Sequence, residues 1–355
     1  MAFLNLKINK LNISEKNSPI FFPDIGTFFN QDIKLAKKLI QKLANSGAEV
    51  IKGEILHDPN IALNINVKEP YLKNNGNLKL ENTRKLIERK IVTLDKYEKL
   101  FNYCKKINIP FVLSVYDFKG ADFAFEIGAS ALKIASSNIV HRPLIEHVTR
   151  YNIPIILDTG KSSFDEISRA IKWCRNKKFN KLHIQHSPYA PPAPINKHDL
   201  RMIQSLKKYF KCTVGLSDHH HGNEMLYAAI ALGATTVEKG IISSEIKDDQ
   251  DVYHALNIDD FKHVNQQCKN IFYAMGKEKR DLKKNDPRHS YRMGIVANRN
   301  IKKGTKIDLS MLSFSFPKKG IPVEDSNKIY GKKIGKNIKK NNPIFWTDIN
   351  GINSK

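Results

Sequence analysis

The chain has 355 residues, a net charge of +24 and four cysteines, and this composition excludes several classes of protein. The length allows a sizeable core and two domains, since a single α/β barrel takes about 250 residues. No apolar run approaches the roughly 20 residues of a membrane span, and the first residues lack the pattern of a secretory signal. The cysteines form no CxxC pair, so we expect reduced packing residues in a soluble, cytoplasmic protein.

The 59 lysines and arginines are spread along the whole chain, with no basic helix interleaved with aromatic residues. A nucleic-acid interface needs basic residues gathered on one face or along one helix. We therefore favour a compositional bias over a nucleic-acid-binding role. Part of the charge can still attract an anionic substrate.

Runs rich in β-branched residues alternate with helical patterns up to Met275. The expected strands are Ile20–Pro23, Glu49–Lys52, Phe111–Ser114, Ala131–Ile134, Ile155–Leu157, Leu182–Gln185, Thr213–Leu216 and Thr236–Glu238. The expected helices are Gln31–Ser46, Ala121–Ile127, Pro143–Arg150, Phe164–Arg175, His198–Tyr209, Asn223–Leu232 and Asp259–Met275. Strands and helices that alternate in this way form parallel sheets with helical crossovers. Eight alternations predict a (β/α)8 TIM barrel over residues 1–276.

Ionisable or hydroxyl side chains stand where each expected strand ends. They are Asp24, Lys52 with Glu54, Ser114 with Asp117, Lys133 with Ser136, Asp158 with Thr159, His186 with Ser187, Ser217 through His219, and Lys239. The carboxyl ends of parallel barrel strands meet at one face, where such barrels carry their active sites. We therefore predict one pocket at this face, with several cations suited to a phosphate or a carboxylate.

Two further segments have distinct compositions. Residues 57–90 are too polar for a core and are interpreted either as a functional loop or lid, or as a disordered loop without function. Residues 277–291 form a charged linker, and residues 292–355 show the short strands and turns of a small, mostly β domain. Within that domain Ile301-Lys302-Lys303-Gly304 is echoed by Ile338-Lys339-Lys340-Asn341, which suggests internal pseudo-symmetry.

Several short motifs, in order and spacing over nearly the full chain, resemble the sialic acid synthase family. They include Pro23-Asp24-Ile25-Gly26, Leu132-Lys133-Ile134-Ala135-Ser136, His186-Ser187-Pro188, Gly215-Leu216-Ser217-Asp218-His219 and Val237-Glu238-Lys239. That family joins a (β/α)8 barrel to a small antifreeze-like (SAF) domain. Its members condense phosphoenolpyruvate with an N-acetylated hexosamine to give a nine-carbon 2-keto acid. The resemblance thus implies this fold and a metal-dependent phosphoenolpyruvate-condensing transferase.

The resemblance also implies roles for individual residues. We expect Asp24, Lys52 and Lys133 to be catalytic, and His219 to bind Mn²⁺ or Mg²⁺. The expected substrate-binding residues are Ser136, Ser217, Glu54, Asn138, Thr159, His186, Lys239 and Arg292. Arg292, or Arg288 if the alignment slips, would reach into a partner subunit, which implies a domain-swapped homodimer.

Departures from the family pattern keep an alternative open. Gly240 stands where much of the family has a second metal-binding histidine, and His220 and His221 are either replacement ligands or exposed loop residues. Asp158 would repel a phosphate unless it is protonated or paired with a lysine. Our main hypothesis is a nonulosonic acid synthase. The alternative is a catalytically impaired paralogue that binds a sugar or regulates a partner.

Overall fold

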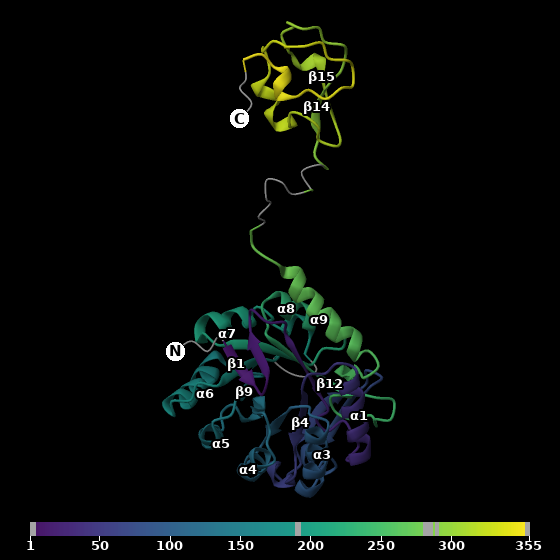
Figure 1. Cartoon of the computed structure of the whole chain (residues 1–355). Helices are drawn as coiled ribbons and strands as arrows, with labels where there is room; N and C mark the ends of the chain where they lie inside the picture. The colour runs from purple at the N-terminus through teal and green to yellow at the C-terminus, as the bar shows by residue number, and fades with distance from the viewer. Residues whose placement is uncertain (1–4, 189–192, 280–286, 288–290, 352–355) are drawn as a thin grey trace. The chain divides into compact units, whose positions relative to one another are not determined.

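The chain divides into two compact units, Met1–Gly276 and Lys277–Lys355 (Figure 1). The computed structural model describes residues 5–188, 193–279, 287 and 291–351. Within these ranges no helix is both long and apolar enough to cross a membrane.

Eight parallel strands close into a barrel in the first unit, and a helix follows each of them (Figure 1). The strands pair in the order β11-β10-β9-β8-β7-β4-β3-β12, and β11 pairs with β12 to complete the ring. They are β3 (Ile20–Asp24), β4 (Ile51–Ile55), β7 (Phe111–Val115), β8 (Ala131–Ile134), β9 (Ile155–Asp158), β10 (Leu182–His186), β11 (Thr213–Asp218) and β12 (Thr236–Ile242). The helices are α1 (Ile33–Asn45), α3 (Leu94–Lys106), α4 (Phe118–Glu126), α5 (Arg142–Val148), α6 (Phe164–Asn176), α7 (Met202–Phe210), α8 (Glu224–Ala231) and α9 (Phe261–Met275). The predicted (β/α)8 barrel is confirmed.

Two apolar clusters show how the strand side chains divide. Alternate residues of a barrel strand face the interior or the surrounding helices. The large cluster holds the helix-facing residues, such as Leu132, Leu157 and Ile184. The smaller cluster joins interior residues such as Phe22 and Ile156 to the hairpin of β1 (Asn5–Ile8) and β2 (Leu11–Ser14). This hairpin was not predicted, and its apolar side chains close the amino-terminal end of the barrel.

The second barrel strand differs from the prediction. It runs from Ile51 to Ile55 and not from Glu49 to Lys52. The prediction ended too early because Gly53 and Glu54 are residue types that are uncommon in strands. Gly53 makes room for α3, since a Cβ there would lie 3.2 Å from the ring of Phe101. The helix α3 itself was missed.

The segment between β4 and α3 is folded, so its interpretation as a disordered loop is wrong. It contains a 3₁₀ turn η1 (Pro59–Ile61), a hairpin of β5 (Lys68–Leu72) and β6 (Leu78–Asn82), and a short helix α2 (Thr83–Glu88). The guanidinium of Arg84 donates to the carbonyl oxygens of Pro59 and Ala62, at 2.7 and 2.9 Å. Tyr71 and Leu86 are buried. This segment is called the insertion below.

The second unit is a small β structure whose two echoed motifs pair with each other. Ile301 and Ile338 exchange backbone hydrogen bonds of 2.8 and 2.9 Å. The side-chain oxygen of Asn337 accepts from the amide of Lys303, and that of Asn300 accepts from the amide of Lys340. The regular strands are β14 (Gly294–Ala297) and β15 (Leu312–Ser315), which pair antiparallel. The two echoed motifs therefore pair reciprocally, while the symmetry of the whole unit stays a prediction.

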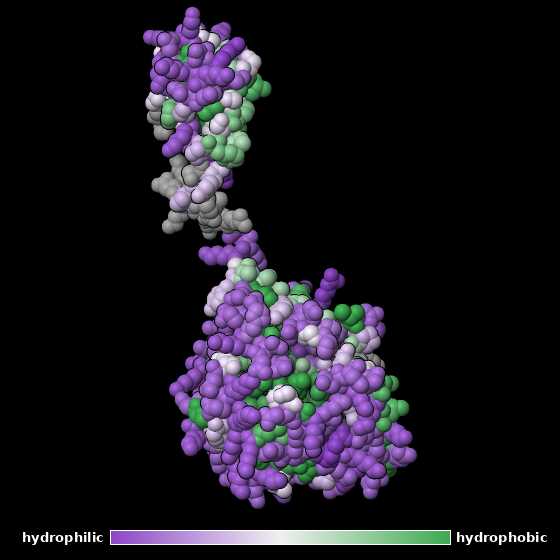
Figure 2. Space-filling view, turned by 90° about the vertical axis from the view of Figure 1, so that its right-hand side faces the viewer, coloured by the Kyte–Doolittle hydropathy of each residue, from purple (hydrophilic) through white to green (hydrophobic). Residues whose placement is uncertain are grey.

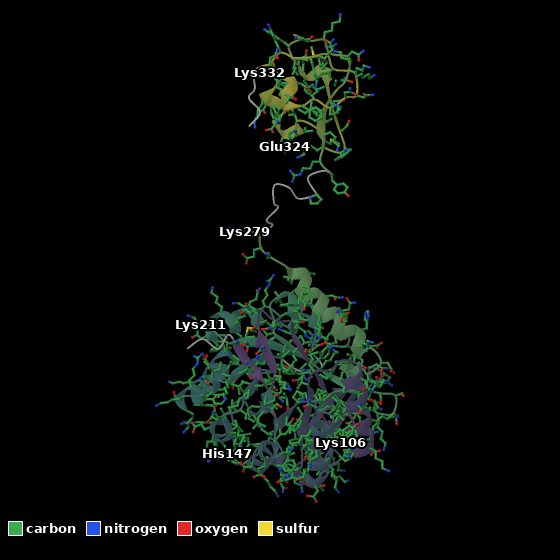
Figure 3. The ribbon with its side chains drawn as sticks, in the orientation of Figure 1. Lys106, His147, Lys211, Lys279, Glu324 and Lys332 are labelled. Carbon is green, nitrogen blue, oxygen red and sulfur yellow. The ribbon has the colours of Figure 1, made fainter. Side chains whose placement is uncertain are left out.

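Charged side chains surround both units. Lys106, Lys211 and Lys332 are exposed and project outward in different directions within their units (Figure 3). The face shown in Figure 2 is mainly hydrophilic, with hydrophobic residues gathered in the middle of the barrel unit. These lysines are spread over the surface and do not form a single basic patch.

We expect Ile8→Ala to destabilise the first unit by about 2–5 kcal/mol, because it empties a fully buried site in the hairpin cluster. Urea unfolding monitored by circular dichroism measures this loss. Leu11→Ala, at a half-buried position of the same hairpin, is the control and should cost less. Equal losses for the two variants would contradict the closing role of the hairpin.

Candidate active site

A cavity of about 260 Å³ lies at the carboxyl ends of the barrel strands. Its wall includes the predicted residues Asp24, Lys52, Glu54, Lys133, Ser136, Ser217 and His219. The insertion adds Ile61, Ile87 and Lys90 to the wall, as the lid interpretation requires. The strand ends therefore bring seven of the predicted site residues into one place.

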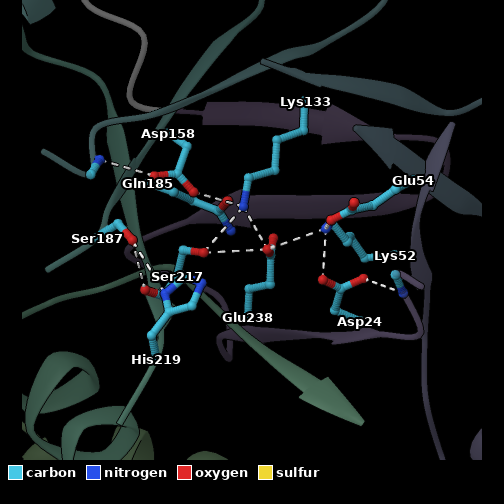
Figure 4. Close-up of polar contacts among 12 residues, drawn as sticks. Asp24, Lys52, Glu54, Lys133, Asp158, Gln185, Ser187, Ser217, His219 and Glu238 are labelled. Atoms are coloured by element: carbon cyan, nitrogen blue, oxygen red, sulfur yellow. Dashed lines mark hydrogen bonds and ion pairs between the residues drawn. The ribbon is translucent and has the colours of Figure 1, made fainter. Parts of the chain in front are cut away.

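Glu238 connects the two lysines at the centre of this cavity (Figure 4). Its Oε1 lies 2.5 Å from Nζ of Lys133 and 3.8 Å from Nζ of Lys52. Lys133 also contacts Asp158 at 2.8 Å and Ser217 Oγ at 3.1 Å. Burial alone would lower the pKa of Lys133, but the charges of Asp158 and Glu238 outweigh burial and raise it. The ammonium group therefore stays charged without a ligand.

Asp24 is the carboxyl group poised to exchange a proton near neutral pH. Its Oδ2 lies 2.6 Å from Nζ of Lys52, and its Oδ1 accepts from the amide of Gly26 at 2.7 Å. Burial, which dominates, and the nearby charges of Glu54 and Glu238 raise the pKa of Asp24 to about 7, although Lys52 opposes the shift. A group with this pKa suits general acid or base chemistry at neutral pH.

Two acidic residues of the cavity, Asp158 and Glu54, are both paired with a lysine. Asp158 contacts Lys133, whose charge overcomes the effect of burial and lowers the pKa of Asp158. Glu54 lies 2.9 Å from Lys52 and accepts from the hydroxyl of Tyr116 at 3.0 Å, and Lys52 likewise overcomes burial and lowers its pKa. Asp158 was expected to repel a phosphate unless it is protonated or paired with a lysine. It stays ionised and is paired with Lys133, so the second condition is met.

Four predicted residues of the barrel unit are absent from the cavity wall: Asn138, Thr159, His186 and Lys239. Each of these side chains makes a hydrogen bond elsewhere. Asn138 donates to the carbonyl oxygen of Tyr116, and Thr159 donates to that of Gln185. His186 bonds to the carbonyl oxygen of His198, and Lys239 donates to the carboxylate of Asp218. On β10 the side chains of Leu182 and Ile184 pack in the helix-facing cluster. By alternation His186 shares their side and Gln185 faces the interior.

Arg292 is exposed in the second unit, and Arg288 lies outside the described residues. His220 and His221 do not line the cavity either. The positions of these two histidines therefore do not support their interpretation as replacement metal ligands.

Glu238 and His254 line the cavity but were not among the site residues predicted from the sequence, and Gln185 faces the barrel interior without lining the cavity. The side-chain amide of Gln185 and Oε2 of Glu238 are buried without a hydrogen-bond partner among the described residues. Alternation along β10 and β12 would have selected Gln185 and Glu238 over His186 and Lys239. His254 follows β12 in a loop, where no regular pattern could have selected it.

The described residues contain no group of three or more His, Cys, Asp or Glu side chains arranged to hold a metal ion. Two imidazoles do meet in the cavity, because the ring centroids of His219 and His254 are 5.1 Å apart. Burial first, and then the charges of His219, Lys239 and His221, lower the pKa of His254 well below its ordinary value. A neutral imidazole is the form that binds metals. The donor set therefore fits a divalent cation that keeps open positions for substrate.

With this geometry in place, comparison with known proteins identifies the class. The model of the NeuB family matches residues 39–280, and the model of the SAF domain matches residues 292–350. The chain belongs to the NeuB family and carries a carboxyl-terminal SAF domain.

Its relatives include several named synthases. The N,N'-diacetyllegionaminic acid synthase of Campylobacter jejuni is 31% identical over 92% of this chain and 98% of its own length. The pseudaminic acid synthase of Helicobacter pylori is 25% identical over 93% of this chain and 98% of its own length. The solved sialic acid synthetase of Leptospira borgpetersenii has a TM-score of 0.69 at 22% identity, over 80% of this chain and 94% of that one. That structure supports the fold alone.

We expect the contribution of Asp24 to stability to fall as pH rises from about 4 to about 7, because its pKa is raised in the folded state. In this window the folded state keeps a proton that the unfolded state has released, so for this group a rise in pH favours unfolding. Asp24→Asn has no such proton, so the unchanged protein should lose stability relative to Asp24→Asn as pH rises through the window. Urea unfolding at a series of pH values measures this.

The control for this prediction is Asp32→Asn, which changes the exposed cap of α1 to another good capping residue. It should keep the pH dependence of the unchanged protein. Identical slopes for Asp24→Asn and the unchanged protein would show that Asp24 is ionised throughout the window.

Proposed function

We propose that this chain condenses phosphoenolpyruvate with an N-acetylated amino sugar to give a nonulosonic acid and inorganic phosphate. The observation that carries the proposal is the convergence of Lys52, Lys133, Ser217 and Asp24 in one buried cavity. Family membership and the names of the relatives support the same class of reaction. The alternative of an impaired paralogue is not favoured, because Asp158 and Glu54 are paired with lysines and leave the lysine cluster intact.

The lysines supply the binding of phosphoenolpyruvate. The phosphate and the carboxylate of this substrate need cations and hydroxyl donors. Lys133 and Ser217 already contact each other, and Lys52 stands across Glu238 from them. Ser136 lines the same cavity and can add a hydroxyl donor. We assign Lys133 as the main cation for the phosphate.

The reaction balances with one water molecule. C3 of phosphoenolpyruvate forms a bond to the aldehyde carbon of the sugar, and the aldehyde oxygen takes up a proton. Water adds at C2, and the C–O bond to phosphate then breaks to give the 2-keto acid. Asp24, with a pKa near 7, can accept a proton from this water and is held in place by Lys52 and the amide of Gly26.

A divalent cation fits the charge balance of the cavity. Its wall carries six carboxyl groups (Asp24, Glu54, Asp158, Asp218, Glu238, Asp251) and three lysines (Lys52, Lys90, Lys133). Asp24 is partly protonated near neutral pH and Asp218 is paired with Lys239, so the excess of negative charge is smaller than these numbers suggest but remains. An anionic substrate would enter this excess of negative charge at a cost. A cation such as Mn²⁺ or Mg²⁺, held by His219, would offset the excess and act as a Lewis acid on the sugar carbonyl.

We also propose that the working unit is a homodimer. One side of the hairpin in the insertion exposes Leu78 and Leu80, and the preceding loop exposes Leu63 and Ile65. The second unit separately exposes Tyr291, Phe316 and other large apolar side chains. Contiguous exposed apolar surface is typical of interfaces. A second copy of the chain would bury these apolar side chains. Arg292 is the candidate to act in the barrel of that second copy.

The proposed reaction is tested by incubating the protein with phosphoenolpyruvate, Mn²⁺ and a panel of N-acetylated amino sugars. We expect sugar-dependent phosphate release together with a product of the mass of a nonulosonic acid. Lys133→Ala should lose binding of phosphoenolpyruvate in calorimetric titration, because the main cation is gone. Lys106→Ala, at an exposed surface position, is the control and should bind normally. Absence of sugar-dependent release across the panel would overturn the proposal.

The dimer is tested by replacing Leu78 and Leu80 with lysine. We expect a shift from dimer to monomer in light scattering at micromolar concentration, because two charges would be buried in the interface. Lys79→Glu lies between them on the other side of the strand and should leave the dimer intact. A monomer for the unchanged protein would refute the dimer.

A further inference from the structure

Gly240 on β12 lines the cavity together with His219, but the space around it has no room for a side chain that could bind a metal. A Cβ added to Gly240 would lie 2.8 and 2.9 Å from ring atoms of Phe28. Phe28 is buried and lines the cavity itself. Any side chain at position 240 would therefore have to displace an aromatic ring. The same hypothetical Cβ would lie 3.4 Å from Cβ of Ala255, the residue that follows His254 in the chain.

His254 is a buried imidazole without a hydrogen bond among the described residues. It ends the 3₁₀ turn η5 (Val252–His254), is 6% exposed and lines the same cavity as His219. Its Nε2 lies 3.5 Å from Oδ1 of Asp251. Because no hydrogen bond from the described residues occupies the ring and it lies in the cavity wall, its nitrogens are available to a ligand in the cavity.

The spacing of the two rings suits a shared cation. With metal–nitrogen bonds of 2.0–2.1 Å, two imidazoles about 90–110° apart on one ion have centroids about 4.5–5.3 Å apart. The observed separation between His219 and His254 is 5.1 Å, with the ring planes inclined by 67°. Oδ1 of Asp251 lies 3.5 Å from Nε2 of His254, too far for a direct hydrogen bond, but its negative charge favours a proton on Nε2 and leaves Nδ1 as the donor.

We propose that His219 and His254 together form a two-imidazole site for a divalent transition metal. The proposal deepens the synthase reaction above and rests on it for the role of the cation. A pair of imidazoles favours Mn²⁺, Fe²⁺, Co²⁺ or Zn²⁺ over Mg²⁺, which prefers oxygen ligands. The remaining coordination positions are left to water and to oxygen atoms of the substrate. The site is thus built from β11 and the loop after β12, and not from β12 itself.

Binding of Mn²⁺ to the full chain, followed by the loss of its free-ion signal in electron paramagnetic resonance, tests the site without turnover. We expect His219→Ala and His254→Ala each to weaken binding by about tenfold or more. His220→Ala is the matched control from the same loop, because its ring packs on His198 and lies outside the cavity wall. It should bind Mn²⁺ as the unchanged protein does. Normal binding by His254→Ala would overturn the proposal.

A measurement on the unchanged protein covers the case in which His254→Ala fails to fold. Pulsed electron paramagnetic resonance of bound Mn²⁺ detects directly coordinated imidazole nitrogen, and we expect two such rings. One ring would overturn the proposal. Weaker binding of Mg²⁺ than of Mn²⁺ is also expected, and equal binding would count against the two-imidazole site.

These readouts separate the metal site from the proposed reaction. Two coordinated imidazoles without sugar-dependent phosphate release would leave the metal site standing and remove the synthase reaction. Turnover of a sugar together with normal Mn²⁺ binding by His254→Ala would support the synthase reaction and overturn the two-imidazole metal site.

Discussion

The candidate site depends on the burial of lysine side chains inside a closed barrel. A lone ammonium group in such a place would lose its proton or unfold the chain around it, since desolvation of a charge is costly. Here carboxylates inside the barrel compensate the charge: Asp24 from the next strand and Glu54 from the same strand for Lys52, and Asp158 from the next strand and Glu238 from across the barrel for Lys133. The result is a set of cations fixed in position before any ligand arrives.

The same compensation determines how an anion can bind. A phosphate that approaches Lys133 meets the two carboxylates that already contact this lysine, so affinity depends on how much of their charge is offset. Asp24 can remain protonated near neutral pH because its pKa is raised to about 7. A cation bound at the two imidazoles would add positive charge on the side of His219. Binding of metal and binding of phosphoenolpyruvate should therefore reinforce each other, because both act on one local charge balance.

The sequence predicted the barrel and most of the cavity because strand ends in a parallel barrel are forced to meet. Its errors come from two physical causes. Position at a strand end does not determine the side on which a residue points, so His186 and Lys239 were chosen where alternation favours Gln185 and Glu238. Contacts between distant loops leave no periodic signal, which is why His254 could not be found in advance. The hairpin of β1 and β2 differs, because Leu6 and Ile8 alternate with polar residues before a two-residue turn, and this local signal was overlooked.

Gly240 shows why a single departure from a family pattern says little without the fold. From the sequence it appears as a lost ligand and favours an impaired protein. In the structure the ring of Phe28 occupies the space that a side chain would need, and an imidazole from the following loop lies beside His219. In the proposed two-imidazole site, His254 would supply the donor that Gly240 cannot supply. The absence of a side chain at one strand position therefore does not by itself argue against metal binding in this barrel.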